Sequence, residues 1–299
     1  MSMPSGLSAF PITPADADGR VDLAALGRII DRLVAAQVGS IGVLGSTGIY
    51  MYLSRDERRR AVEAAQDRCG AIPLVVGIGA LRTDEAIDLA QDARAMGAAA
   101  GLLSAVSYAP LSQDEVYEHF SAVAKASGLP ICIYDNPGTT HFSFSPDLVA
   151  RLSRVPGIVG IKNPPPPDGQ MAHHLASQRS ATSPGFSIGY SGDWCCPEAM
   201  IAGADTWYSV LGGIFPRICV ALSRAAQAGD AVQARRLDAA LAPVWEVFRS
   251  HSSLRAVYEI ARQMGLTTAE PPRPILPLGA EGRRDIAQML RSLPPDICG

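Results

Sequence analysis

The chain contains eight short apolar segments, which lie near residues 7–12, 41–44, 72–78, 101–103, 129–134, 158–161, 186–190 and 206–210. Each segment is continuously apolar rather than alternating with polar residues, which is typical of parallel strands covered on both faces. The segments follow one another at intervals of about thirty residues, the length of one strand–helix unit, except for a shorter last interval. This pattern predicts eight parallel strands that alternate with helices.

The stretches between the apolar segments carry helical signals. Apolar residues recur three and four positions apart between residues 23 and 33, which predicts a helix with one apolar face. Two further helices begin with capping boxes, at Ser54 to Glu57 and at Ser112 to Glu115. Eight strand–helix repeats predict a (β/α)8 TIM barrel over residues 1–214, followed by a mostly helical C-terminal extension over residues 215–299.

A doubly wound sheet is the main alternative fold. It would be marked by a glycine-rich phosphate-binding turn after a strand. The nearest match, Gly77 to Arg82, lacks the third small residue of that motif, so the barrel is favoured.

Composition excludes several classes of function. A net charge of −3 without a basic cluster gives no surface for nucleic acid or an anionic membrane. No apolar run is long enough to span a bilayer, and residues 1–14 lack the features of a secretory signal, so we expect a cytoplasmic protein. The six cysteines and five histidines show no metal-ligand spacing, which predicts neither a metal site nor a disulfide framework.

Lys162 stands out among the basic residues. Of the 26 Lys and Arg residues only two, Lys125 and Lys162, are lysine, and arginine cannot act as an amine nucleophile. Lys125 falls on the polar side of a predicted helix and is interpreted as a surface residue. Lys162 ends the sixth apolar segment, just before four prolines at 164–167 that cannot continue a strand. An amine is therefore predicted at the carboxyl end of a buried strand, where TIM-barrel active sites lie.

Other polar or aromatic residues follow the remaining strands. Each has a simple structural explanation by itself, such as a turn, a helix cap or packing. Together they form a candidate site at one end of the barrel. Beside Lys162, its members are Ser46, Thr47 and Gly48 after the second strand, Tyr108 after the fourth, Tyr134 and Thr139 at and after the fifth, Gly192 and Asp193 after the seventh, and Tyr208 in the eighth.

This set suits imine chemistry. An uncharged lysine amine attacks a ketone and forms an imine, and burial favours the uncharged amine. The protonated imine then withdraws electrons while carbon–carbon bonds form or break. Tyr134 would move protons, and Ser46 and Thr47 would hold the carboxylate of a 2-oxo acid such as pyruvate. The sequence therefore predicts a Schiff-base lyase or aldolase acting on a 2-oxo acid and an unassigned aldehyde.

The same residues resemble the dihydrodipicolinate synthase / N-acetylneuraminate lyase family over nearly the whole chain, from Phe10 to Leu278. The resemblance lies in Gly45-Ser-Thr-Gly48, Tyr134-x-x-Pro137-x-x-Thr140, Gly160-Ile-Lys162, Ser191-Gly-Asp193 and Arg273-Pro-Ile-Leu-Pro277. It implies a TIM barrel with a helical extension, usually assembled as a homotetramer, that needs no metal or organic cofactor. It also implies roles for single residues. Lys162 forms the imine and Tyr134 shuttles protons. Ser46 supplies the carboxylate-binding hydroxyl and Thr47 the catalytic relay hydroxyl. Tyr108 completes the relay of a neighbouring subunit, and Gly192 presents a backbone carbonyl to the substrate.

Several positions depart from the family pattern. Thr139 stands where the synthases carry an arginine for the second substrate's carboxylate, and a hydroxyl cannot replace that bidentate contact. Ile49 replaces a common glutamate, and Trp194 replaces an acidic residue of the sialic-acid lyases. Together with Tyr208, which occupies a position usually held by a small aliphatic residue, these changes suggest a more apolar or aromatic pocket for the second substrate.

Three alternatives stay open at this point. The chain could be an authentic dihydrodipicolinate synthase that condenses pyruvate with aspartate semialdehyde, although Thr139 argues against it. It could instead be a dehydratase of a keto-deoxy sugar acid, which would use the same imine to eliminate water. It could also be a non-catalytic binding barrel that retains the pocket.

Overall fold

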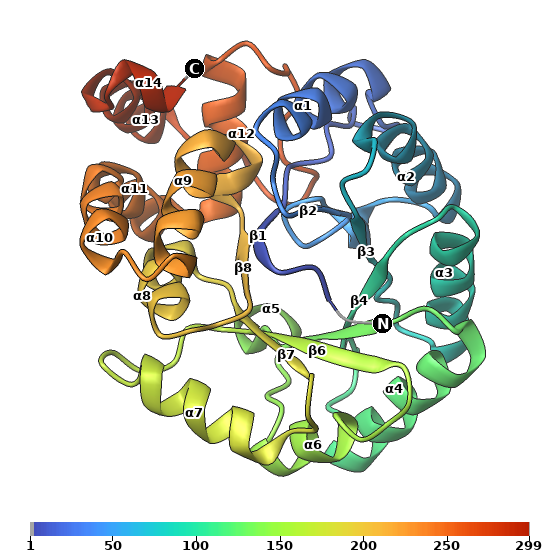
Figure 1. The fold of residues 1–299 in the computed structure, drawn as a ribbon. Coiled ribbons are helices and arrows are strands. Elements are labelled where there is room, and N and C mark those ends of the chain that lie inside the picture. The colour runs from blue at the N-terminus through green and yellow to red at the C-terminus, as the bar shows by residue number, and fades with distance from the viewer. Residues whose placement is uncertain (1–2, 299) are drawn as a thin grey trace.

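The structure, a computed structural model, describes residues 3–298, so residues 1, 2 and 299 at the outer ends of the two expected domains lie outside it. Eight parallel strands close into a barrel in sequence order, which confirms the predicted fold class (Figure 1). All eight lie within or next to the predicted apolar segments. They are β1 (Gly6–Ala9), β2 (Ser40–Val43), β3 (Leu74–Gly77), β4 (Ala100–Ser104), β5 (Ile131–Tyr134), β6 (Ile158–Asn163), β7 (Ser187–Tyr190) and β8 (Thr206–Ser209).

Two apolar layers hold the barrel together. The larger layer fills the space between the strands and the surrounding helices. The smaller layer includes Phe10, Leu102, Cys132, Tyr134 and Tyr208, from the barrel strands and the segment after β1. Because successive side chains of a strand point to opposite faces, alternate residues such as Cys132 and Tyr134 share one layer. Tyr134 is the register partner of Lys162 across the β5–β6 pair, so both side chains project from the same face.

Helices surround the barrel on its outer side (Figure 1). Ser112 and Glu115 form the complete predicted capping box before α4, whereas Ser54 caps α2 alone, because the carboxylate of Glu57 accepts a hydrogen bond from the Val21 backbone N–H instead. The helices that follow the strands are α1 (Leu23–Ala35), α2 (Arg55–Cys69), α3 (Thr83–Ala95), α4 (Gln113–Ser127), α5 (Pro137–Thr140), α6 (Pro146–Leu152), α7 (Met171–Ala181), α8 (Cys196–Ile201) and α9 (Pro216–Gln227).

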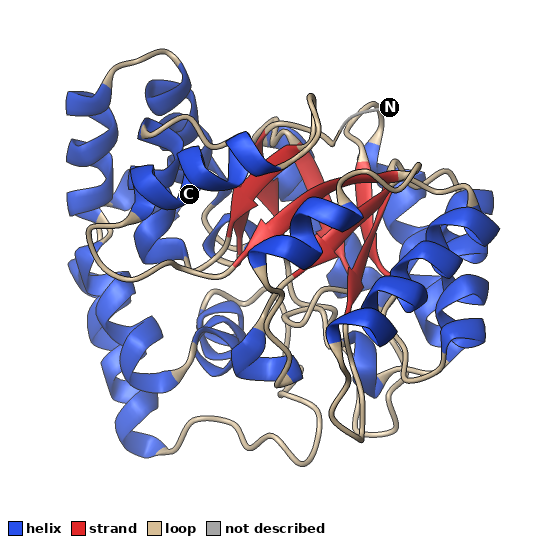
Figure 2. Ribbon diagram, turned by 90° about the horizontal axis from the view of Figure 1, so that it is seen from below, coloured by secondary structure: helices blue, strands red, loops and turns tan. Residues whose placement is uncertain are grey.

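The described chain after α9 is mostly helical, with a loop between residues 264 and 279, and it packs on one side of the barrel (Figures 1 and 2). It forms α10 (Ala231–Ala240), α11 (Ala242–His251), α12 (Ser253–Gln263), α13 (Ala280–Ser292) and α14 (Pro295–Cys298). The expected division between residues 214 and 215 would assign α9 to the extension. However, α9 packs against β1 and follows β8 as the other outer helices follow their strands. We therefore propose that the barrel domain continues to about residue 228.

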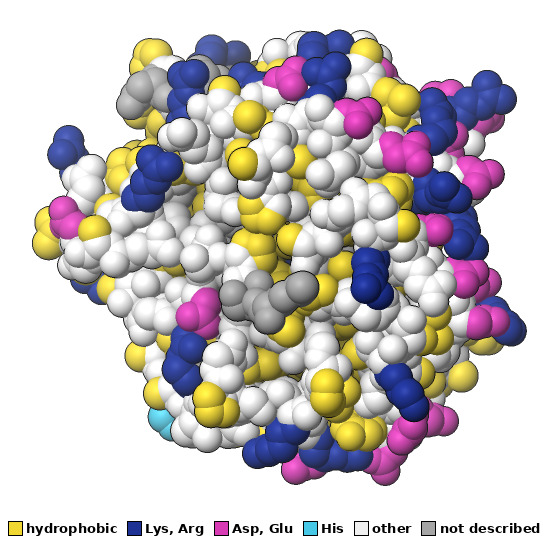
Figure 3. All heavy atoms as spheres, turned by 45° about the vertical axis from the view of Figure 1, so that its right-hand side comes forward, with side chains coloured by type: hydrophobic (Ala, Val, Ile, Leu, Met, Phe, Trp, Pro, Cys, Tyr) yellow, Lys and Arg dark blue, Asp and Glu magenta, His cyan; other side chains and the backbone are white. Residues whose placement is uncertain are grey.

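The surface fits the charge balance of the sequence. In Figure 3, basic and acidic side chains are interspersed on the face shown, without a large patch of one sign. Among residues 3–298, no helix is both long and apolar enough to cross a membrane. Cys69, Cys132, Cys195, Cys196 and Cys219 are free thiols, and the side chain of Cys298 is not described.

Candidate active site

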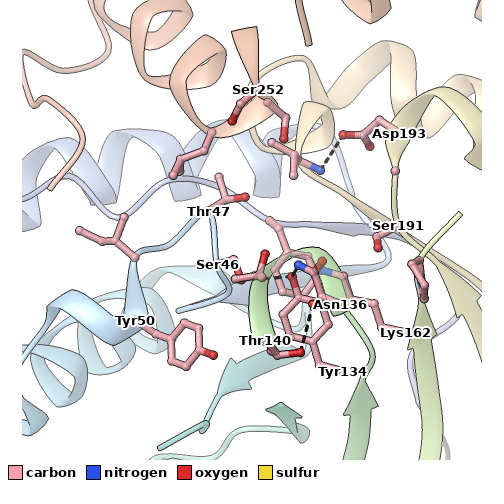
Figure 4. Close-up of a pocket in the computed structure, with 18 of the residues that line it drawn as sticks. Ser46, Thr47, Tyr50, Tyr134, Asn136, Thr140, Lys162, Ser191, Asp193 and Ser252 are labelled. Atoms are coloured by element: carbon pink, nitrogen blue, oxygen red, sulfur yellow. Dashed lines mark hydrogen bonds between the residues drawn. The ribbon is translucent and has the colours of Figure 1, made fainter. Parts of the chain in front are cut away.

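A cavity of about 550 Å³ lies at the carboxyl ends of the strands (Figure 4). Most of the site residues predicted from the sequence line it, although they come from strands far apart in the chain. These residues are Ser46, Thr47, Tyr134, Thr139, Lys162, Gly192 and Asp193. Three others, Gly48, Tyr108 and Tyr208, do not line it.

Lys162 lies in the wall of this cavity with only 4% of its surface exposed. Its Nζ is 4.3 Å from the ring centroid of Tyr134 and 4.4 Å from that of Phe10. It makes no hydrogen bond or ion pair with any other residue that the structure describes. A buried amine normally has a carboxylate partner, since burying a charge without one is costly. This amine is instead available to a molecule in the cavity.

The phenol of Tyr134 is fixed by two hydrogen bonds. Its Oη accepts a bond from Asn136 Nδ2 at 2.8 Å and shares a bond of 3.1 Å with Ser46 Oγ (Figure 4). We had expected Thr47 to supply the catalytic relay hydroxyl. The hydroxyl in contact with the phenol is instead that of Ser46. Because its bonds orient the phenol beside Lys162, Tyr134 is well placed to exchange a proton with a molecule bound at the amine.

The loop that carries Ser46 and Thr47 has a strained backbone at both ends. Leu44 has φ of 59° and the β-branched Ile49 has φ of 52°, a left-handed region that such residues rarely adopt. A side chain at Gly45 would put its Cβ 2.7 Å from the Phe10 ring, so the loop requires glycine there. Thr47 is 8% exposed, and its hydroxyl has no hydrogen-bond partner in the described part of the chain. Thr47 thus presents an unused donor and acceptor to the cavity.

Asp193 lies at the cavity wall, but the protein already engages its carboxylate. Oδ1 accepts hydrogen bonds from Trp207 Nε1 at 2.8 Å and Ser209 Oγ at 2.7 Å. Oδ2 accepts two more, each of 3.1 Å, from the backbone N–H groups of Val210 and Leu211. Asp193 was expected to bind substrate, whereas this network makes it a link between the loops after β7 and β8.

Comparison with known proteins identifies the family of this chain. The model of the dihydrodipicolinate synthetase family matches residues 3–293. The chain belongs to this family. It is 34% identical to the 4-hydroxy-tetrahydrodipicolinate synthase of Leptothrix cholodnii over 90% of this chain and 91% of that protein. The corresponding enzyme of Albidiferax ferrireducens is 35% identical over 89% and 90%.

Solved structures of dihydrodipicolinate synthases have the same fold. The dihydrodipicolinate synthase of Agrobacterium tumefaciens is 54% identical in sequence to this chain. Its crystal structure matches with a TM-score of 0.95 over 97% of this chain and 98% of that chain. The chloride-inhibited enzyme of Acinetobacter baumannii, solved in complex with pyruvate, is 28% identical, with a TM-score of 0.90 over 97% and 99%. As a member of the dihydrodipicolinate synthetase family, the chain is an enzyme of the class I, Schiff-base-forming lyase type.

Three predicted site residues of this family member do not line the cavity. Tyr208 is buried in the inner layer, where its Oη bonds to Cys132 Sγ at 3.3 Å and its ring packs edge-on against Phe10. It therefore does not line the second-substrate pocket as we had proposed. Gly48 fits tightly in its turn, since a Cβ there would lie 2.9 Å from the Leu44 backbone nitrogen. Tyr108 is 100% exposed on the loop between β4 and α4.

Asn136 and Tyr50 are among the residues of the site that sequence reasoning missed. Asn136, which holds the Tyr134 phenol, follows that residue in the same loop, and its amide was the available signal. Tyr50 lines the cavity and shares a 2.7 Å hydrogen bond with Ser104 Oγ. Burial raises the pKa of Tyr50 to about 12, so this second phenol stays protonated at neutral pH. Among residues 3–298, no group of three or more His, Cys, Asp or Glu side chains is arranged to hold a metal ion.

We expect Asp135→Asn to stabilise the enzyme at alkaline pH. Burial raises the pKa of Asp135 to about 7, only partly offset by the Phe144 N–H, and Oδ1 is buried without a partner in the described structure. Since the folded state binds this proton more tightly than the unfolded state, stability falls as pH rises from about 4 through 7. Asparagine does not ionise, so the variant avoids this loss of stability. Its free energy of unfolding should exceed that of the wild type by about 2–4 kcal/mol at pH 8 and differ little at pH 4.

Urea unfolding of both proteins at pH 4, 6 and 8 measures this difference. Asp168→Asn, at an exposed position without a hydrogen bond or ion pair to other described residues, is the matched control and should change little at any pH. Equal stabilities of wild type and Asp135→Asn at pH 8 would contradict the prediction.

Proposed function

We propose that Lys162 forms a Schiff base with pyruvate or a related 2-oxo acid, and that the enzyme uses this imine to make or break a carbon–carbon bond with an aldehyde. The observation that carries this proposal is the buried Lys162 amine, which has no hydrogen-bond or ion-pair partner among the described residues and lies 4.3 Å from the ring centroid of Tyr134. The pyruvate complex of the related Acinetobacter baumannii enzyme supports the choice of 2-oxo acid.

The steps balance without a further reactant. The Lys162 amine attacks the ketone carbon, C2, and water leaves to give the imine. Loss of a proton from C3 gives an enamine, whose C3 attacks the aldehyde carbon and forms the new bond. The aldehyde oxygen takes up a proton, and water then hydrolyses the imine to release a 4-hydroxy-2-oxo acid and restore the amine. The reverse sequence cleaves the same bond.

The chain supplies a group for each of these needs. The Tyr134 phenol and Ser46 hydroxyl, joined by their 3.1 Å hydrogen bond, would carry protons to and from the substrate. The unpartnered Thr47 hydroxyl and the backbone N–H groups of Ser46 and Thr47 would hold the 2-oxo acid's carboxylate, while Gly192 would offer its carbonyl. The protonated imine is itself the electron sink, so the proposal requires no metal or organic cofactor.

We further propose a homo-oligomer, a dimer or tetramer, in the cytoplasm. Tyr108 is fully exposed and away from its own cavity, so it would complete the proton relay only in a second copy of the chain.

Trapping with borohydride tests the proposed function. Reduction in the presence of pyruvate should add to the protein the mass of one pyruvate less one oxygen atom, and peptide mapping should place it on Lys162. Lys125, on α4, is an internal control because it is the chain's second lysine. An adduct on Lys125 alone, or no adduct with pyruvate or other small 2-oxo acids, would refute the proposal.

A further inference from the structure

The cavity offers little charge beyond the amine that forms the imine. Lys162 is the only cationic side chain among the described residues that line it, and Asp193 is the only anionic one. The Asp193 carboxylate already accepts four hydrogen bonds from protein groups, and its charge would repel rather than attract a second carboxylate. A second substrate that carried a carboxylate would lose its hydration there without meeting a side-chain counter-charge, which is costly.

The walls of the cavity are largely apolar. Met51, Tyr52 and Trp194 are unusually exposed for large apolar side chains, at 39%, 44% and 39%, and all three line this cavity. Exposed apolar side chains gathered at one hollow mark a surface for an apolar ligand. Ile49 and Leu254 extend the same wall. Since Lys162 is buried and these residues are exposed, the apolar surface lies toward the mouth, beyond the amine.

Arg249 and the start of α12 are two groups that could attract a carboxylate, but they do not form a carboxylate site. The guanidinium of Arg249 lies 5.9 Å from the ring centroid of Trp194 and donates to the Trp245 carbonyl at 3.2 Å, but Arg249 does not line the cavity. Ser252 and Ser253, at the start of α12, do line it. Their backbone and hydroxyl groups suit a neutral oxygen of the substrate, and no basic side chain reinforces them.

From this arrangement we propose that the second substrate is an uncharged aldehyde with an apolar body, either branched or aromatic, packed against Trp194, Tyr52 and Met51. This inference rests on the proposed imine at Lys162. In the reaction, C3 of the enamine attacks the aldehyde carbon of this second substrate, and the aldehyde oxygen takes up a proton. The apolar body of the substrate remains outside the reacting centre.

A matched pair of aldehydes tests this selectivity. 4-Methylpentanal and succinic semialdehyde have the same number of non-hydrogen atoms and the same branching, and differ in an isopropyl group against a carboxylate. With pyruvate as co-substrate, we expect kcat/KM for aldol formation to be at least about tenfold higher for 4-methylpentanal, and benzaldehyde to be accepted as well. Product formation is measured by chromatography and mass spectrometry.

Variants connect the preference to named residues. Trp194→Ala should lower kcat/KM for 4-methylpentanal by about tenfold, because it removes an apolar contact surface. Leu81→Ala is the matched control, since Leu81 is 57% exposed but does not line the cavity, and it should leave kcat/KM unchanged. Thr139→Arg adds a cation to the wall and should raise kcat/KM for succinic semialdehyde at least tenfold.

Borohydride trapping with pyruvate on the same preparations separates two kinds of failure. No adduct on Lys162 overturns the proposed function itself. An adduct combined with a preference for succinic semialdehyde overturns only the inference, and would assign the second substrate's carboxylate to the start of α12. An adduct without turnover of any of these aldehydes overturns it as well.

Discussion

Replacing Lys162 by alanine should abolish turnover, lowering kcat by about 10⁴-fold or more, and should prevent trapping of pyruvate by borohydride. The reason is that no other described side chain of the cavity offers an amine, so the variant has no group that can form the imine. The fold should survive, because the Lys162 side chain makes no ion pair or hydrogen bond with other described residues, and its backbone hydrogen bonds remain in alanine. Steady-state kinetics together with thermal unfolding measures both effects.

Lys125→Ala is the matched control for this experiment. It removes the chain's second lysine, on the outer helix α4, and should leave both kcat and trapping unchanged. If Lys162→Ala retained more than about one hundredth of the wild-type kcat, the nucleophile would have to be another group.

Tyr134→Phe should lower kcat by about 10²-fold or more, the usual contribution of a positioned proton donor and acceptor. The phenylalanine keeps the ring beside Lys162, so packing around the amine is preserved and only the hydroxyl shared with Ser46 and Asn136 is lost. Trapping should still label Lys162 at long incubation times, but more slowly. Single-turnover rates of imine formation and steady-state kcat should therefore fall together.

Tyr190→Phe is the corresponding control. Tyr190 is also fully buried, and its hydroxyl is bonded to His174 Nδ1 at 2.8 Å outside the cavity. This substitution removes a buried hydrogen bond, so it should lower stability by about 1 kcal/mol without a comparable loss of kcat. Equal losses of kcat in the two variants would show that removing any buried phenol impairs the enzyme, and would contradict a proton-transfer role for Tyr134.

The barrel and the position of the amine could be predicted from local features of the sequence. Continuous apolar segments separated by amphipathic stretches are enough to specify parallel strands covered by helices. Lys162 could be placed at a strand end because the prolines after it cannot take part in a strand ladder. In a TIM barrel that end is the catalytic one, so Ser46, Tyr134 and Lys162 could be grouped before any coordinates were known.

The rest depends on contacts between distant segments. Asp193 could not be recognised as a linking residue, because its donors come from the following strand and loop, 14 to 18 positions along the chain. Tyr208 was wrongly assigned to the cavity lining, since the sequence does not reveal that its side chain lies in the inner layer beside Cys132. Ser252 and Ser253 reach the site from α12, at a separation that no local pattern reports.

The central claim is that an imine at Lys162 activates the methyl group of pyruvate, and proton exchange tests it most directly. In deuterated water without any aldehyde, the enzyme should replace the methyl protons of pyruvate by deuterium, followed as loss of their NMR signal, because the imine and its enamine interconvert by removing a C3 proton. The account predicts catalysed exchange with the wild type and none with Lys162→Ala. Exchange that persists at the wild-type rate in Lys162→Ala, or is absent from the wild type, would contradict it.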